Sequence, residues 1–325
     1  MKTRLNIGLL VFVFCLIAGK TGSGAGQSGD IKFACDYLGQ KKPGSTPVLF
    51  APGIISTGRE HSAAMFSPDG REIWLARLSP AEIWFMSLEN GKWAEPKPFP
   101  LEKDYRYLYP FLSPDGNRLF FTSNRPVRPG DMPKSQGVGD LWVVTRNGGN
   151  WSEPVHLGEQ INFGTLQSVG SVSLQGNLYY AVRSGNKPRP VMCIHYAELV
   201  NGSYSPPRRI DELYSDAASH SPFISQDESY ILFSSFRGGM GASDLFISFR
   251  TTEGGWTRPQ NLGSRINSAA KDEFPYVTPD GKYLFFNSNR VSELNDRVIP
   301  DGPGNIFWVE ARIIEELRPK AIVER

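Results

Sequence analysis

The chain has 325 residues, of which 35 are basic and 33 acidic, and its formal net charge is +2. This balance argues against a nucleic-acid-binding protein, because such proteins carry a concentrated basic surface. The 33 glycines, 25 prolines and 12% aromatic residues are typical of an all-β protein with many short strands and turns.

The N-terminus has the pattern of an export signal. Lys2 and Arg4 precede an apolar run over residues 7–18, which is too short to span a bilayer comfortably, and small residues follow as far as Ala25. This predicts a cleaved signal peptide over 1–25 and a short linker over 26–36. An uncleaved membrane anchor is the alternative. We therefore expect a periplasmic or secreted protein with no membrane span after signal cleavage.

The cysteines do not define a disulfide framework. Cys15 lies inside the apolar run, and two cysteines, Cys35 and Cys193, remain in the mature chain. Export permits a disulfide, but the spacing of these two matches no known framework. The sequence leaves open whether they are bonded.

A turn motif recurs along the rest of the chain, at intervals of 46 to 60 residues. Its copies are SPDG at 67–70, SPDG at 113–116, SLQG at 173–176, SQDE at 225–228 and TPDG at 278–281. A short, mostly apolar segment precedes each copy and a strand-like run such as RLFFTSNR follows it. This arrangement predicts a β-hairpin around each turn.

Two further runs follow each hairpin. The third begins with sequences such as DLWVVTR and DLFISFR, and an aromatic–x–x–Pro pattern opens the fourth, with Trp93, Trp151, Tyr204 and Trp256 as its aromatic residues. Four-stranded units of this length, repeated around an axis, form a β-propeller, because packing one sheet on the next buries the apolar faces of both.

We therefore predict an all-β fold: one β-propeller domain over 37–325, with four-stranded blades centred on 58–101, 106–160, 166–211, 219–266 and 271–318. Residues 37–57 resemble the end of a blade and are expected to supply a closing strand to the last one. A sixth, degenerate blade is a second possibility.

The SPDG turn, the FF-x-SNR strand, the Asp-Leu-Trp or Asp-Leu-Phe strand and the Trp-x-x-Pro…Leu-Gly segment resemble the TolB-like, WD40-like propeller repeats of bacterial exported proteins. The resemblance covers residues 58–318. It implies a propeller, usually six-bladed in this family, and a partner protein of the cell envelope. We expect no counterpart of the separate N-terminal domain that TolB carries, and fold alone does not give function.

The face that carries the connections between second and third strands, together with those between blades, is the expected binding surface. Long connections lie at 126–139 and 291–304, and a shorter basic one at 185–190. Arginines recur at the end of the second strand, where guanidinium groups can form a ring around an anionic ligand or simply brace their own blades. They are Arg77, Arg125, Arg183, Arg237 and Arg290.

Residues that break the repeat at the start of the first strands are further site candidates, because first strands line a propeller's channel. They are Glu60, His61, His220, Asp272 and Glu273. Histidine and carboxylates suit acid–base or metal chemistry, but no known metal-binding or catalytic motif is present. The simpler interpretation is that these residues are hydrogen-bonded polar groups of the channel wall, without a catalytic or metal-binding role.

The sequence thus favours an exported, monomeric, non-enzymatic propeller without a cofactor or metal. It would bind a cell-envelope protein, peptide or glycan through its loop face, and not nucleic acid. The alternative is a carbohydrate-active hydrolase or lyase that uses carboxylates and histidine at the channel mouth, since glycoside hydrolysis usually needs paired carboxylates.

Overall fold

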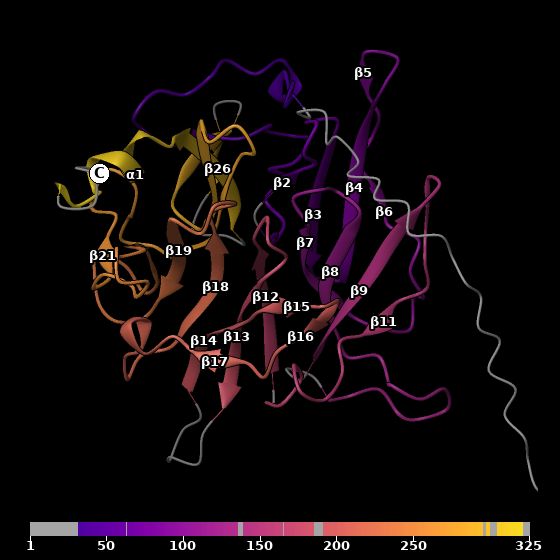
Figure 1. Cartoon of the computed structure of the whole chain (residues 1–325). Coiled ribbons are helices and arrows are strands. Elements are labelled where there is room, and N and C mark those ends of the chain that lie inside the picture. Colours follow the sequence, from indigo (N-terminus) through magenta and orange to yellow (C-terminus); the bar gives the residue numbers. More distant parts are fainter. Residues whose placement is uncertain are drawn as a thin grey trace, which may run out of the picture. The chain divides into compact units, whose positions relative to one another are not determined.

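A computed structural model describes residues 32–62, 64–135, 139–164, 166–184, 191–294, 297–299 and 304–320. The predicted signal peptide and most of the predicted linker lie outside these residues, and the predicted domain bounds stay a prediction. The described part of the chain is a five-bladed β-propeller (Figure 1). The predicted fold class is confirmed.

Each blade is an antiparallel sheet whose strands follow one another from the channel outward. Blade 1 contains β2 (Met65–Phe66), β3 (Glu72–Leu78), β4 (Ala81–Glu89), β5 (Lys92–Trp93) and β6 (Lys97–Pro98). Blade 2 contains β7 (Tyr107–Leu112), β8 (Arg118–Ser123), β9 (Asp140–Asn147), β10 (Asn150–Trp151) and β11 (Val155–His156). Blade 3 contains β12 (Leu166–Val172), β13 (Leu178–Ser184), β14 (Val191–Ala197) and β17 (Arg208–Arg209), with the hairpin β15 (Leu199–Val200) and β16 (Ser203–Tyr204) at its edge.

The last two blades follow the same plan. Blade 4 contains β18 (Ser219–Ile224), β19 (Tyr230–Ser235), β20 (Asp244–Phe249) and β21 (Gln260–Asn261). Blade 5 contains β22 (Asp272–Val277), β23 (Tyr283–Ser288), β26 (Asn305–Glu310) and β1 (Val48–Leu49). A small hairpin, β24 (Ser292–Leu294) and β25 (Arg297–Ile299), projects from it. The helical segments are η1 (Tyr37–Gly39), η2 (Asp211–Leu213) and α1 (Arg312–Glu316).

The ring closes with the N-terminal segment, as predicted. Val48 and Leu49 pair antiparallel with Trp308 and Phe307, so β1 is the outer strand of blade 5. Five blades therefore complete the ring, and the described residues form no sixth. Phe50 is fully buried and packs edge-on against Phe285 and Trp308 at 4.9 and 5.3 Å between ring centroids. This aromatic packing fastens the closing segment to the last blade.

The repeated turn has a simple chemical basis. In blade 1 the Ser67 hydroxyl donates to Asp69 at 2.6 Å and accepts from the backbone N–H of Glu72, while Gly70 adopts a φ of 74°. Thr278 and Asp280 repeat the contact at 2.7 Å in blade 5. Asp and Ser stabilise such turns through local side-chain bonds, and Gly supplies the left-handed position at no steric cost.

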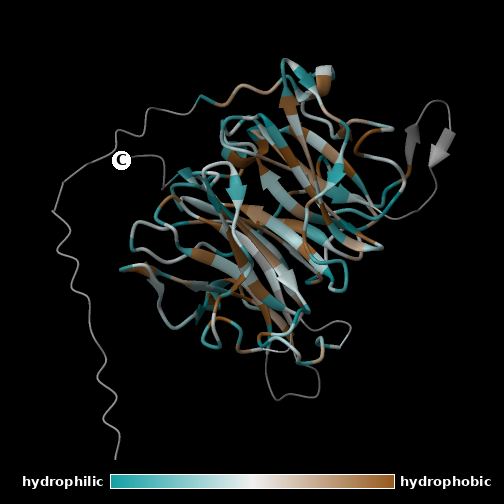
Figure 2. Cartoon of the chain, turned by 90° about the vertical axis from the view of Figure 1, so that its right-hand side faces the viewer, coloured by the Kyte–Doolittle hydropathy of each residue, from teal (hydrophilic) through white to brown (hydrophobic). Residues whose placement is uncertain are grey.

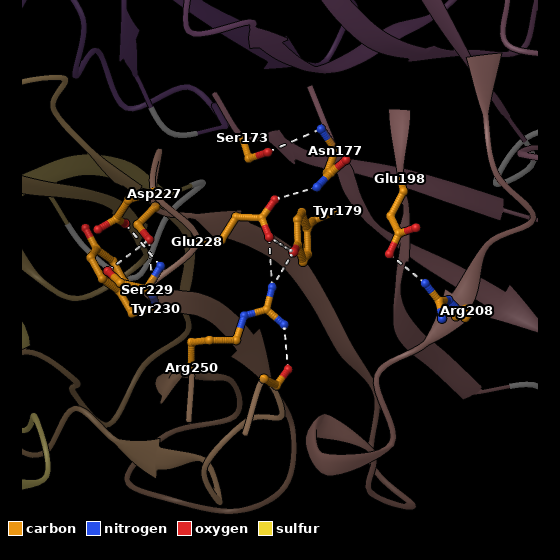
Figure 3. Close-up of polar contacts among 12 residues, drawn as sticks. Ser173, Asn177, Tyr179, Glu198, Arg208, Asp227, Glu228, Ser229, Tyr230 and Arg250 are labelled. Atoms are coloured by element: carbon orange, nitrogen blue, oxygen red, sulfur yellow. Dashed lines mark hydrogen bonds and ion pairs between the residues drawn. The ribbon is translucent and has the colours of Figure 1, made fainter. Parts of the chain in front are cut away.

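Blade 4 departs from this rule at Glu228, which occupies the glycine position with a φ of 60°. Figure 3 shows its carboxylate between blades 3 and 4, where it accepts hydrogen bonds from Asn177 (2.8 Å), Tyr179 (2.9 Å) and Arg250 (2.8 Å). The left-handed conformation costs a non-glycine residue about 1–2 kcal/mol. The carboxylate contacts offset this strain and tie two neighbouring blades together.

The core lies between the blades. In Figure 2 the hydrophobic residues lie largely within the strands, whereas the connections are mostly hydrophilic. Large aromatic side chains, among them Trp74, Phe121, Phe233 and Phe285, are fully buried, as expected where sheets pack face to face.

The fourth strands open at the aromatic residue, as predicted, and are then interrupted. Trp93 and Trp151 pair with the third strand in β5 and β10, and the pairing resumes after the proline, at Lys97 and Val155. Proline has no N–H for the ladder, so the pairing resumes only after it.

Candidate functional site

The first strands of the blades surround a narrow channel. Four of them carry a β-bulge. Three of these bulges have a residue with positive φ, namely Tyr109 (52°), Ser221 (51°) and Phe274 (56°). Bulges of this kind re-aim side chains. Tyr109 of blade 2 stacks on Phe274 of blade 5, with ring centroids 5.5 Å apart, although blade 1 separates these blades in the ring. The two rings therefore meet across the channel and narrow it.

The channel ends in a hollow on the face that carries the Ser67–Gly70 type turns, which we call the turn face. This bowl has a volume of about 460 Å³. Its lining combines apolar side chains of the first strands, such as Phe111, Phe223 and Tyr276, with polar turn residues including Asp227 and Asp280. This hollow is not evident from the sequence, because the residues that line it belong to the repeat and resemble structural positions.

The opposite end of the channel, on the loop face, gathers charged residues around Tyr109. Burial raises the pKa of Tyr109; the Glu273 and Glu60 carboxylates raise it further, whereas Arg106 and Arg183 lower it. The His220 imidazole lies 3.6 Å from Glu273 and 3.0 Å from the Ser221 hydroxyl. Burial lowers the pKa of His220, and the Glu273 carboxylate raises it in part.

Four predicted site residues thus contribute to this mouth, namely Glu60, Arg183, His220 and Glu273. Two others have different surroundings. His61 is 1% exposed, lies 3.4 Å from the Thr57 hydroxyl, and has its pKa lowered to about 4 by burial. Asp272 is fully buried and binds Arg290 at 2.6 Å and the backbone of Ser268 at 2.6 Å. The predicted carboxylate and histidine set is therefore not assembled in one pocket.

The repeated arginines also differ in their contacts. Arg237 donates to the Leu213 carbonyl at 2.6 Å and to Ser219, and Arg290 donates in the same way to Ile266 and Asp272. These two brace their own blades. Arg77 stacks on Trp84, 3.3 Å from the ring centroid. Arg125 has weaker contacts, its nearest carboxylate being Glu102 at 3.6 Å.

The loop face also presents most of the exposed large apolar side chains that the structure describes. They lie in the connections between second and third strands or between blades, and are Ile54, Val127, Met132, Phe163, Tyr214, Phe236, Met240 and Val291. The remainder, Val48, Val155, Leu174 and Val200, lie on outer strands or on the turn face. In the sequence, the length of the connections between second and third strands was the feature that predicted a binding surface on this face. The residues 136–138, 185–190, 295–296 and 300–303 of the predicted binding loops lie outside the described residues.

The described residues contain no group of three or more His, Cys, Asp or Glu side chains arranged to hold a metal ion. Cys35 and Cys193 are both free thiols. Within the same residues, none of the helices has the length and apolar character needed to cross a membrane.

No protein-family model matches the chain, and no curated protein matches its sequence. Solved structures do resemble it in fold. A putative TolB from Agrobacterium tumefaciens has 16% identity and a TM-score of 0.48, over 78% of this chain and 91% of that one. TolB from Acinetobacter baumannii has 14% identity and a TM-score of 0.49, over 79% and 59%.

The calcium-binding protein regucalcin from Agrobacterium tumefaciens has 15% identity and a TM-score of 0.47, over 83% of this chain and 95% of that one. TolB structures are thus among the similar ones, as the resemblance of the repeats led us to expect. At these identities and TM-scores the likeness carries no argument about function, and the fold assignment rests on the sheets described above.

Proposed function

We propose that this chain is an exported, non-enzymatic binding protein that docks a partner protein of the cell envelope through its loop face. The observation that carries the proposal is the gathering of exposed apolar side chains on that face. Phe236 is 44% exposed, Met240 46% and Met132 86%. Single exposed apolar residues are common on protein surfaces, and the proposal rests on their concentration in the connections of one face.

The residue types support a protein partner. Aromatic residues, methionine and arginine are enriched in protein interfaces, and this face combines Phe236, Met240 and Met132 with the charged mouth around Tyr109. Phe236 also packs on His220, with ring centroids 5.4 Å apart. Phe236 therefore adjoins the charged mouth.

The enzyme alternative has less support. Among its five proposed residues, Asp272 is neutralised by Arg290 and His61 is enclosed away from the mouth. General acid–base chemistry needs its groups within reach of one substrate, and here only Glu60, His220 and Glu273 face the same opening.

Site-specific photo-crosslinking in the producing cell tests the proposal. A photoreactive phenylalanine analogue replaces Phe236 in one variant and Met240 in a second. The matched control carries it at Leu174, which is 63% exposed on the turn face. We expect one discrete protein adduct from both loop-face positions and none from Leu174. Equal adducts from both faces, or none from the loop face, would contradict the proposal.

A further inference from the structure

A second hollow lies away from the channel, between blades 1 and 2. This groove has a volume of about 740 Å³. It runs from the Glu72–Arg146 ion pair, where the atoms are 2.9 Å apart, to the Glu102–Arg125 pair at 3.6 Å. The groove shares none of the exposed apolar residues of the loop face. Binding in the groove would therefore be independent of the proposed function.

The wall of the groove is aromatic. Phe85 and Trp151 are half-buried and face it together with Phe99. Phe99 packs edge-on against Trp151, with ring centroids 5.7 Å apart and an interplanar angle of 89°, and Trp74 stacks behind Phe85 at 4.8 Å. Basic groups flank these rings, since Lys97 Nζ lies over the Phe85 ring at 5.2 Å and the Arg146 guanidinium over the Trp151 ring at 4.5 Å from the centroid. A ligand in the groove would therefore meet the exposed parts of the rings together with these two cations.

Arg125 lies at one end of this wall and differs from Arg237 and Arg290 at the same repeat position, whereas Arg77 shares its buried Nε without an acceptor. Arg237 and Arg290 each donate from Nε to a serine hydroxyl and from Nη2 to a backbone carbonyl. Among the described residues, the buried Nε of Arg125 has no hydrogen-bond acceptor, although the side chain is only 15% exposed. A buried donor without an acceptor is costly.

The nearest carboxylate to Arg125 does not supply that acceptor. Glu102 is 53% exposed and 3.6 Å away, beyond ordinary hydrogen-bond distance. The Arg125 guanidinium lies 4.9 Å from the ring centroid of Trp142 and 5.7 Å from that of Tyr105. The planar guanidinium of Arg125 can donate parallel hydrogen bonds to the two oxygens of a carboxylate that approaches from the groove.

The strand at the edge of the groove disfavours a peptide. Residues 95–100 read EPKPFP, so Pro96, Pro98 and Pro100 remove alternate backbone donors along it. Adding a strand to a sheet edge depends on backbone hydrogen bonds, and proline blocks that pairing. Recognition in this groove must therefore come from rings, charges and amides such as Asn150.

We propose that the groove between blades 1 and 2 binds an acidic glycan, with a uronate carboxylate on Arg125 and the sugar rings against Phe85 and Trp151. The binding is reversible and involves no covalent step. Sugars present apolar C–H faces to aromatic rings and hydroxyls to polar side chains, which suits the mixed lining of this groove.

Calorimetric titration of the whole chain with tetragalacturonate tests this inference, with its methyl ester as the neutral counterpart. The variants are R125Q and F85L, with R125K to retain the charge. R208Q, an exposed arginine of blade 3, is the matched control. We expect R125Q to lower the affinity for tetragalacturonate by about tenfold or more and to leave the affinity for the ester unchanged. The affinity of R125K for tetragalacturonate should lie between those of R125Q and the wild type. F85L should lower the affinity for both ligands, and R208Q should change neither.

Three results would overturn the inference: no binding of the uronate by the wild-type chain, an equal effect of R125Q on acid and ester, or binding of an acidic tetrapeptide instead of the glycan. Thermal unfolding of each variant verifies folding. The loop-face adducts of the previous section do not depend on these outcomes.

Discussion

Glu228 offers a sharp test of how the blades are joined. The substitution Glu228→Gly restores the residue that the four other copies of the turn contain and removes the positive-φ strain, worth about 1 kcal/mol. It also removes the acceptor of three hydrogen bonds, from Asn177, Tyr179 and Arg250. Bonds to a charged group contribute about 1.5–3 kcal/mol each and are not additive. Because Glu228 and Arg250 are 16% and 28% exposed, we take about 3 kcal/mol for the group.

The expected net effect of Glu228→Gly is a loss of about 2 kcal/mol in the free energy of unfolding, measured by urea denaturation. The matched control is Gly281→Glu in blade 5, where φ is 70° and the space around an added side chain is open. There the strain has no compensating contact, and a loss of about 1–2 kcal/mol is expected. If Glu228→Gly is as stable as the wild type, or more so, the reasoning about the cluster is refuted.

Three further predictions concern stability. His61 should lower stability in acid: its folded pKa of about 4 lies below the unfolded value of about 6.5, so its contribution is present above pH 6.5 and is lost as the pH falls to 4. His61→Gln should flatten the stability–pH curve in that window, and an unchanged curve would contradict the assignment. Phe50→Ala should cost about 3–5 kcal/mol in urea denaturation, because it opens the closing seam, whereas Val155→Ala on the exposed outer strand of blade 2 should cost little; similar losses would argue against closure by β1. Arg290→Met should cost about 3–5 kcal/mol, because it leaves Asp272 buried without its partner, while Arg125→Met should cost less than 1 kcal/mol. Equal costs would contradict the distinction between Arg290, which braces its blade, and Arg125, for which we propose a binding role.

The repeat made the fold predictable. The Ser–Asp turn chemistry is local in sequence, so each copy of SPDG or TPDG identifies a hairpin, and the echo of a blade end at 37–57 located the closing strand. The Trp-x-x-Pro pattern located the start of the fourth strands, and its proline marks where their pairing with the third strands is interrupted.

The sites were harder to predict, because they depend on contacts between blades. His61 and His220 both stand near the start of a first strand, yet one is enclosed behind the closing segment and the other reaches the channel mouth. The bowl on the turn face consists of repeat residues, so no departure from the pattern revealed it. Five arginines share one repeat position, and only the neighbours from the adjoining connection distinguish Arg125 from Arg290.

The most direct test of the proposed function is hydrogen exchange on the whole chain, with and without the partner captured by crosslinking. We predict that the partner slows exchange in the connections 54–60, 126–135, 210–218 and 236–243, and leaves the turns at 67–70, 113–116 and 225–228 unchanged. Protection confined to the turn face would contradict docking on the loop face and would place recognition in the bowl at the other end of the channel.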